Sequence, residues 1–364
     1  MGASCMVKAC RVDAINELVL MTLNLQYFSS YPKGAEGIAQ AQQKLLTATS
    51  GPNPPDVICV QEGLQGRDIL STVGYDLAIC SGEEGVAQSV CDMVYGDVPT
   101  LAACEPETHQ MLLCNQVYVR KGSRWTVADK GAMQISSDLQ LAGSSGRAQG
   151  KLAVRSMVWV KLSGEAFEGP AVYVMCTHIS GGRFEDSYFV QQLANERQKQ
   201  PARIMTFFEE HRSPGDAGIL VGDFNSTGDY DFIGGAMHAY FKAAIANSPG
   251  VKADAAAASL DENKLEELFK DYMVSPFMAI LGHEWSFAYG KEVGITSGFG
   301  HLIDHMAMSG PLQVLEAEVI YLTNQKFSNQ QDTDLVLTDH NSIKTRFSVG
   351  QKLWQAEACQ PNRR

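Results

Sequence analysis

The sequence lacks long apolar runs. None of its 364 residues belongs to a stretch near the roughly 18 apolar residues that a membrane-spanning helix needs. The first residues also lack the apolar segment of a secretory signal, and Met6 stands where an N-terminal myristoylation signal has Ser or Thr. We therefore expect an intracellular, cytoplasmic protein with no transmembrane segment.

Cysteine is present, but not in a spacing typical of metal ligands. The nine cysteines include no CxxC pair. Cys59 and Cys176 lie inside apolar runs, where a thiol packs as a small hydrophobic group. Without a secretory signal we expect reduced thiols. Cys91 and Cys104 lie in a loop-like stretch and would be able to pair under oxidising conditions.

Positive charge is scarce. The chain has 29 Lys and Arg against 41 Asp and Glu, a formal net charge of −12. Tight non-specific binding of nucleic acid usually needs a basic face, so nucleic acid is possible as a partner but not favoured. The acidic balance does not count against a site that recruits divalent cations. The basic residues that keep a nucleic-acid partner open are scattered around two predicted loops: Arg120, Lys121, Arg124, Arg147, Lys151 and Arg155.

Short apolar runs rich in β-branched residues alternate with a few helical tracts, as in an α/β or α+β protein. We find no repeat, no low-complexity linker and no break in composition. These features predict one domain over 18–349, with an insertion near 81–110 and terminal extensions at 1–17 and 350–364. The expected strands cover 18–25, 56–62, 74–80, 111–120, a run from 125, 152–162, 170–178, 218–223, 301–308, 314–321 and 342–349, and the expected helices cover 35–49, 186–212 and 261–273.

Polar side chains that suit a metal close six of these apolar runs. Asp223 and Asn225 are two residues apart and point to the same face of an extended backbone. Strand ends of this kind meet at one sheet edge, and acidic groups held together there are costly without a cation. Oxygen ligands without Cys favour Mg²⁺ or Mn²⁺. The residues are Asn24, Glu62, His178, Asp223 with Asn225, Asp304, and Asp339 with His340.

The order and wording of these motifs resemble the endonuclease/exonuclease/phosphatase family, whose members include deoxyribonuclease I. The matching phrases are LNLQ at 23–26, QE at 61–62, TH at 177–178, GDFN at 222–225, IDH at 303–305 and TDH at 338–340. GDFN followed by a terminal DH is the specific part, and the resemblance runs from about residue 19 to residue 347. It implies an α/β (α+β) fold, a four-layer α/β sandwich of two mainly antiparallel β-sheets flanked by helices.

The resemblance implies a metal site. Glu62 would be the principal Mg²⁺ ligand, with Asn24 and Asp339 nearby, and Mn²⁺ or Ca²⁺ would be substitutes for Mg²⁺. The alternative for Glu62 is a solvated acid at a strand end. Whether one or two ions take part stays open.

The resemblance also implies catalytic roles. His340 would take the proton of the attacking water, and Asp304 would hold the imidazole in its tautomer. Asp223 and Asn225 would orient the nucleophile and the non-bridging phosphoryl oxygens. His178 would donate to the phosphate, although a structural hydrogen bond is the alternative for a histidine at a strand end.

Two further residues are candidates for substrate binding. Arg155 stands where deoxyribonuclease-like relatives carry an arginine that contacts phosphate, and a surface salt bridge is the alternative. Asn115 stands at a position where the family varies between several polar residues.

The implied activity is divalent-metal-dependent hydrolysis of a phosphoester by in-line attack of an activated water, with a small-molecule or lipid-head-group substrate favoured. The ending TDHNSIKTRF is closer to sphingomyelinase-like members than to nucleases, while Asn225 with Ser226 and Asp304 with His305 depart from the inositol 5-phosphatases. A deoxyribonuclease-like endonuclease is the first alternative. A catalytically silent binding scaffold is the second. The oligomeric state stays unknown.

Overall fold

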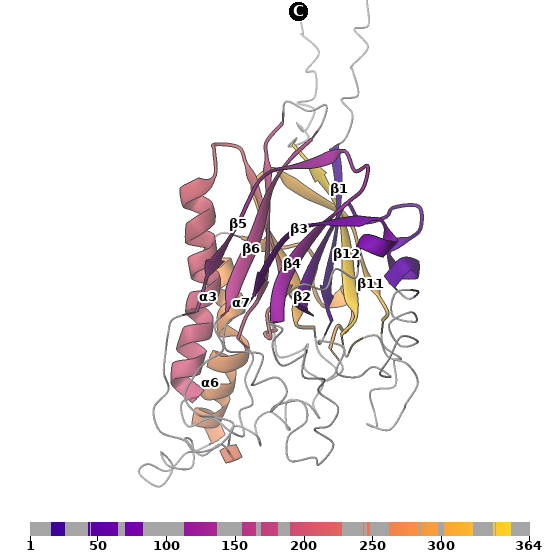
Figure 1. Cartoon of the computed structure of the whole chain (residues 1–364). Coiled ribbons are helices and arrows are strands. Elements are labelled where there is room, and N and C mark those ends of the chain that lie inside the picture. The colour runs from indigo at the N-terminus through magenta and orange to yellow at the C-terminus, as the bar shows by residue number, and fades with distance from the viewer. Residues whose placement is uncertain are drawn as a thin grey trace, which may run out of the picture.

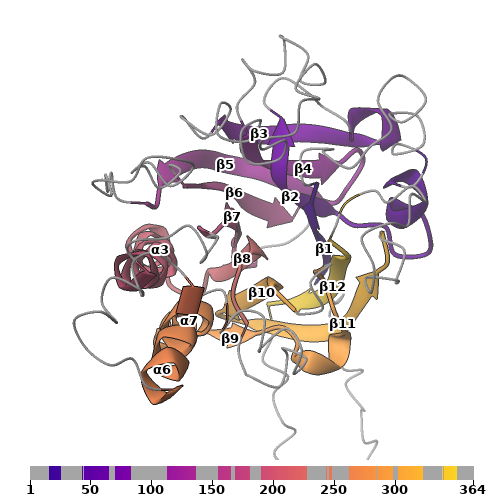
Figure 2. The ribbon, with the colours of Figure 1, turned by 90° about the horizontal axis from the view of Figure 1, so that it is seen from below.

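Two β-sheets packed face to face form the centre of the molecule (Figures 1 and 2). In this computed structural model, each sheet has six strands in the described part of the chain. The described residues are 16–25, 43, 45–64, 70–82, 113–136, 155–164, 169–180, 190–227, 243, 246–247, 262–283, 285–297, 302–322, 338 and 340–350.

The first sheet has the strand order β11-β12-β1-β2-β4-β3, and the second has the order β5-β6-β7-β8-β10-β9. The strands of the first sheet are β1 (Asn16–Asn24), β2 (Val57–Leu64), β3 (Tyr75–Gly82), β4 (Leu113–Arg120), β11 (Leu312–Ile320) and β12 (Ser342–Val349). Those of the second are β5 (Trp125–Gln134), β6 (Ser156–Gly164), β7 (Val172–His178), β8 (Ala217–Asp223), β9 (Ser286–Phe287) and β10 (Asp304–Ser309).

One parallel pair stands at the centre of each sheet. These pairs are β1 with β2 and β7 with β8, and the other described strand pairs are antiparallel. The prediction of two mainly antiparallel sheets is confirmed. Strands whose faces are both covered read as continuous apolar runs, and β7 and β8 are buried along their whole length.

Helices cover the outer faces of both sheets, which completes the four predicted layers. The helices α3 (Val190–His211), α6 (Glu262–Met273) and α7 (Ser275–Gly282) lie over the second sheet (Figure 2). Phe208 and Ile280 pack there against Leu220 of β8. On the outer face of the first sheet, Leu45 of a helical segment at 45–49 packs in a hydrophobic cluster with residues of β1 and β2. Two short 3-10 helices, η2 (Ser71–Val73) and η7 (Lys291–Val293), complete the described elements.

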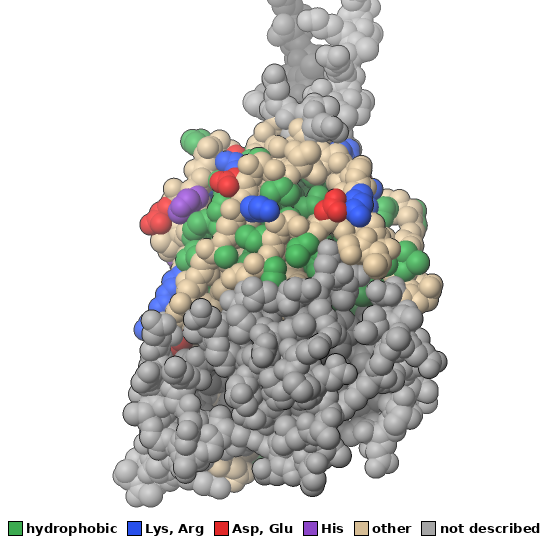
Figure 3. Space-filling view, viewed as in Figure 1, with side chains coloured by type: hydrophobic (Ala, Val, Ile, Leu, Met, Phe, Trp, Pro, Cys, Tyr) green, Lys and Arg blue, Asp and Glu red, His purple; other side chains and the backbone are tan. Residues whose placement is uncertain are grey.

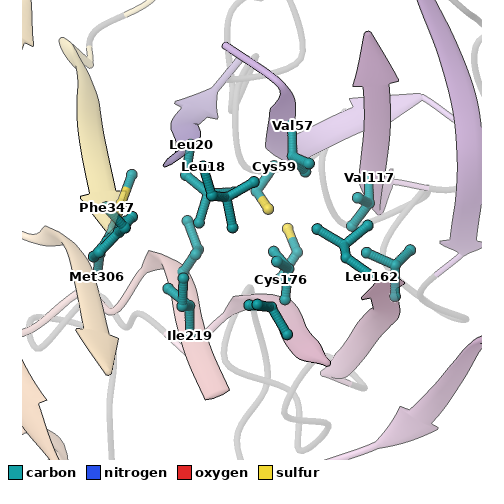
Figure 4. Packing of buried hydrophobic residues seen from close by; sticks show 14 of the residues in the cluster. Leu18, Leu20, Val57, Cys59, Val117, Leu162, Cys176, Ile219, Met306 and Phe347 are labelled. Atoms are coloured by element: carbon teal, nitrogen blue, oxygen red, sulfur yellow. The ribbon is translucent and has the colours of Figure 1, made fainter. Parts of the chain in front are cut away.

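The main core lies between the two sheets (Figure 4). Leu18 and Leu20 of β1 point toward Ile219 of β8, as their two-residue spacing on a strand requires. Each of these three side chains is fully buried. Burying a Leu or Ile side chain stabilises a fold by about 1.5–3 kcal/mol, so the sheet-to-sheet contact is the main source of cohesion.

Some sequence predictions fall outside the described residues or need correction. Most of the expected insertion near 81–110 and most of the expected helix over 35–49 lie outside, and the domain bounds 18–349 stay a prediction. Asp304, predicted to close an apolar run, instead begins β10. Because β10 is antiparallel to β8, its first residue still reaches the edge where β8 ends. None of the described helices combines the length and apolar character that crossing a membrane requires.

Gly222 allows β7 and β8, the two central strands of the second sheet, to approach each other closely near the end of β8. Its φ is +149°, and a Cβ built there would lie 1.8 Å from the carbonyl oxygen of Thr177 on β7. Only glycine fits this position, because a side chain would overlap the neighbouring backbone.

We predict that Gly222→Ala destabilises the protein by about 3 kcal/mol or more, because the backbone of β7 or β8 must shift. The matched control is Gly122→Ala. Gly122 also has a positive φ, +73°, but open space around it, so only the backbone strain of about 1–2 kcal/mol applies. Urea unfolding of both variants measures the difference. Equal losses of stability would contradict the close approach.

Candidate functional site

The predicted site residues meet where the central parallel pairs of the two sheets end. Asn24 is the last residue of β1 and is in register with Gln61 of β2. His178 and Asp223 are the last residues of β7 and β8 and are in register with each other. Asp304, the first residue of β10, stands opposite Asp223. The two sheets therefore bring their polar ends to one edge of the sandwich.

His340 and Asp304 form a buried pair. Nδ1 of His340 lies 2.8 Å from Oδ2 of Asp304, and the two side chains are 9% and 1% exposed. The backbone amide of His340 donates to the hydroxyl of Thr338, which itself donates to the carbonyl of Asn24. The backbone of His340 and its Nδ1 are thus both fixed, and its Nε2 lies 3.8 Å from Oδ2 of Asp223.

Asp223 is a second deeply buried acid of the site. Its Oδ2 accepts a hydrogen bond from Nδ2 of Asn24 at 2.9 Å, and its Oδ1 accepts one from the backbone amide of Asn225 at 2.7 Å. Burial is the main cause that raises the pKa of Asp223 to about 7; His340 opposes the rise, and the neighbouring Asp304 and Glu62 add to it. The negative charge is therefore costly at neutral pH unless a cation compensates it.

His178 is met by a donor at each ring nitrogen. Nη1 of Arg155 lies 2.9 Å from Nδ1, and Nδ2 of Asn225 lies 2.9 Å from Nε2. Burial, helped by the charge of Arg155, holds the pKa of His178 well below its usual value, so the ring is neutral at pH 7. A neutral imidazole accepts at one nitrogen only. One of the two contacts is therefore unfavourable, and turning one donor toward an anion would relieve it.

The backbone is strained at two of the predicted site residues. Among the described residues other than glycine, Glu62 and Asn225 are the ones with positive φ, at 52° and 47°. Glu62 lies in an irregularity of β2 between Val60 and Gly63, and its side chain is 23% exposed. Its Oε1 lies 3.8 Å from Nδ1 of His178. Strain of this kind costs about 1–3 kcal/mol for each residue and is typical of functional sites.

Other predicted residues lie at the margin of this arrangement. Asn115 of β4 is buried and donates through Nδ2 to the carbonyl of Ser156 on β6 at 2.8 Å, so it joins the two sheets. Asp339, predicted as a metal ligand, lies outside the described residues. Arg155, expected either at the site or in a surface salt bridge, is at the site, beside His178.

The sequence analysis did not find Arg197. This arginine of α3 is fully buried and donates through Nη2 to the carbonyl of Asn225 and, at 2.6 Å, to Oγ of Ser226. Three residues further along α3, Gln200 accepts a hydrogen bond from the backbone amide of Ser180. Both side chains support loops that carry site residues, but in the sequence they look like the polar face of an amphipathic helix.

We predict that Arg197→Lys lowers both the thermal midpoint and the turnover of any substrate, because lysine cannot donate to two acceptors with the planar fork of arginine. Losing a hydrogen bond made by a buried charged group costs about 1.5–3 kcal/mol. Arg212→Lys, directly after the last residue of the same helix, is the matched control. Arg212 makes a partly exposed pair with Glu209, and such pairs contribute about 0–1 kcal/mol. An Arg197→Lys protein as stable and active as the control would contradict this role.

The donor set fits a divalent cation. One ligand atom from each of Asp223, Asp304 and His340 lies within 4.8 Å of the others. Since Nδ1 of His340 already faces Asp304, the oxygens are the better ligands, and Glu62 offers the most accessible carboxylate. Oδ1 of Asp304 is buried without a hydrogen-bond partner in the described part of the chain. A cation at this edge would offset the charge that burial makes costly.

The elevated pKa of Asp223 predicts a pH dependence of stability without metal. A carboxyl group whose pKa is about 7 in the folded state and near 4 when unfolded binds its proton more tightly when folded. Its contribution to stability is therefore present at acidic pH and is lost as pH rises from about 4 to about 7.

We expect the thermal midpoint of Asp223→Asn, measured in EDTA, to rise relative to the parent protein as pH increases from 5 to 8. Asp76→Asn is the control, since that carboxylate is 71% exposed. A constant difference between Asp223→Asn and the parent across this range would show that the burial of charge has no effect.

The comparisons with known proteins agree with this architecture. Among protein-family models and curated protein sequences, nothing matches the chain. Solved structures do match. An endonuclease/exonuclease/phosphatase family protein from Bacteroides thetaiotaomicron has a TM-score of 0.52 at 13% identity, covering 93% of this chain and 99% of that one. The human Nocturnin catalytic domain with bound sulfate has a TM-score of 0.51 at 14% identity, covering 92% and 94%. A functionally unknown conserved protein from Enterococcus faecalis has a TM-score of 0.50 at 11% identity, covering 92% and 100%.

The chain therefore has the endonuclease/exonuclease/phosphatase fold, a four-layer α/β sandwich. The resemblance drawn from the motifs is confirmed at the level of the fold. It covers nearly the whole length of both this chain and the matching chains.

Proposed function

We propose that this protein is a divalent-metal-dependent phosphoester hydrolase of the endonuclease/exonuclease/phosphatase family. The observation that carries the proposal is the buried pair of His340 and Asp304 beside Asp223. A histidine oriented by a carboxylate is the usual arrangement of a general base, and Nε2 of His340 lies 3.8 Å from Oδ2 of Asp223, where acids of the site meet.

His340 takes the proton of the attacking water. Its Nδ1 is occupied by Asp304, so Nε2 is the nitrogen that acts. Asp304 holds the ring in this tautomer and stabilises the imidazolium that forms. Asp223, whose Oδ2 lies 3.8 Å from Nε2, orients the water. Asn225 is held by Arg197 through its carbonyl, and its Nδ2 lies 2.9 Å from Nε2 of His178, where it would contact a phosphoryl oxygen.

His178 and Arg155 bind the phosphoryl oxygens. With Arg155 donating to Nδ1, the proton of the neutral imidazole lies on Nε2, where it can be donated to an anion. The guanidinium of Arg155, on the Nδ1 side of the ring, provides further donors for the anion. Nocturnin, which has the same fold, was solved with a bound sulfate, an anion with the tetrahedral oxygens of a phosphate.

Glu62, Asn24 and Asp339 would hold Mg²⁺, and Mn²⁺ or Ca²⁺ would be substitutes. The strained backbone of Glu62 directs its carboxylate to the end of β2, one strand away from Asn24. When bound, the cation supplies charge stabilisation for the phosphoryl group and the leaving oxygen.

A small-molecule or lipid-head-group phosphoester is the favoured substrate. On the face shown in Figure 3, acidic and basic side chains of the described residues lie interspersed, with apolar groups between them. The net charge of −12 likewise favours a small-molecule or lipid-head-group substrate over nucleic acid. A deoxyribonuclease-like activity is the alternative, and a DNA affinity that falls steeply with salt would favour it.

We predict that His340→Ala lowers the metal-dependent hydrolysis of bis-p-nitrophenyl phosphate by about 10²–10⁴-fold, the usual contribution of a general base. Asp304→Asn lowers it as well, because the amide no longer stabilises the imidazolium. His211→Ala is the control, since His211 is exposed on α3 and stacks on Phe207. Each rate is measured with Mg²⁺, with Mn²⁺ and with EDTA.

Rates that are unchanged by EDTA would contradict the metal requirement. Absence of hydrolysis of this diester, of p-nitrophenyl phosphate, of sphingomyelin and of plasmid DNA would overturn the enzyme assignment. The protein would then be a binding scaffold with this fold. Among the active substrates, the ratio of diester to monoester hydrolysis identifies the substrate class.

A further inference from the structure

Cys80 of β3 and Cys114 of β4 lie side by side on the outer face of the first sheet. Their sulfur atoms are 2.8 Å apart, although the residues are 34 positions apart in the sequence. This separation is only about 0.8 Å longer than a disulfide bond. In the strand register Cys80 stands opposite Gln116 and Cys114 opposite Gly82, so the two cysteines form a diagonal pair across adjacent strands.

The surroundings of the pair favour thiol chemistry. Cys80 is half-buried and so can be reached by a small oxidant, while Cys114 is buried. A hydrogen bond with Cys114 lowers the pKa of Cys80, and the amide of Gln116, 3.8 Å from its sulfur, acts in the same direction, although burial opposes them. The thiolate is the reactive form of cysteine, so a lowered pKa favours attack by Cys80.

We propose that Cys80 and Cys114 are a disulfide-forming site that reacts with small-molecule disulfides such as oxidised glutathione. The thiolate of Cys80 attacks one sulfur of the oxidant, forming a mixed disulfide and releasing one glutathione thiolate. Cys114 loses its proton and attacks the sulfur of Cys80, which closes the bond between the strands and releases the second glutathione. The protein loses two electrons and two protons, and the oxidant is reduced to two thiols.

A second pair of cysteines provides an internal comparison. Cys59 of β2 and Cys176 of β7 point toward each other between the two sheets (Figure 4). Both are fully buried, and burial is the main cause that raises the pKa of Cys59 well above its usual value. The Cys59 thiol therefore stays protonated, and both thiols are buried out of reach of the oxidant, so they remain reduced under the conditions that oxidise Cys80 and Cys114.

The crosslink would lie beside the candidate site. Cys114 pairs with Gly63 of β2, the residue after Glu62, and precedes Asn115, which joins the two sheets. Gln116 fills the space next to Gly63, where a Cβ would lie 2.5 Å from its Oε1. The disulfide would thus fix β3 to β4 directly next to the strained segment that carries Glu62.

Peptide mapping of the full-length protein tests the proposal. No Lys or Arg lies between Cys80 and Cys114, so cleavage after glutamate is needed. Cuts at Glu83 or Glu84 and at Glu107 give three peptides, one with Cys80, one with both Cys91 and Cys104, and one with Cys114. The protein is incubated with oxidised glutathione, denatured, alkylated and cleaved, beside Cys80→Ser, Cys114→Ser and the double variant Cys91→Ser/Cys104→Ser.

We expect the peptides of Cys80 and Cys114 to be joined, with the loss of two hydrogens, in the parent and in the double variant. The joined species is absent from both single variants, and Cys59 and Cys176 carry the alkyl label in all four proteins. The oxidised double variant also gains a higher thermal midpoint, which a reductant reverses. Full alkylation of Cys80 and Cys114, or pairing of Cys80 with Cys91 or Cys104 instead, would overturn the proposal. These readouts do not depend on hydrolytic activity.

Discussion

A carboxylate buried where the two sheets meet, that of Asp223, is the group on which the arrangement of the site depends. It accepts hydrogen bonds from Asn24 of the first sheet and from the amide of Asn225, and it faces both histidines. Burying an acid beside two others is unfavourable unless a proton or a cation compensates the charge. The neighbouring groups therefore form an environment around a negative charge that the described residues do not neutralise.

The topology explains how residues almost 200 positions apart reach this carboxylate. Each sheet places its parallel pair at the centre, and both pairs end at the same edge of the sandwich. Antiparallel neighbours reach that edge with their beginnings, as β10 does with Asp304. A strand that runs toward this edge therefore carries its site residue at its end, and a strand that runs away from it carries the residue at its beginning. The apolar stretches of the same strands fill the core between the sheets.

Much of the fold and part of the site could be predicted from the sequence for a physical reason. Strands buried on both faces are continuous apolar runs, so the polar residue that ends each run, such as His178 or Asp223, is conspicuous. The role of Arg197 could not be predicted because the periodicity of a helix does not distinguish a buried arginine from a solvated one. The contact between Cys80 and Cys114 could not be predicted because it depends on strand register; the sequence left a pairing of Cys91 with Cys104 open only for oxidising conditions.

The irregularity in β2 restricts insertions and deletions in this strand during evolution. Between Val60 and Gly63 the pairing with β4 slips, and the direction of the Glu62 side chain follows from the number of residues in that stretch as well as from their chemistry. Adding or removing one residue there would turn the carboxylate to another face of the sheet. Connections between strands are under no such constraint. Insertions and deletions in the connections can therefore reshape what the protein recognises, while the strands that carry the acids keep their length.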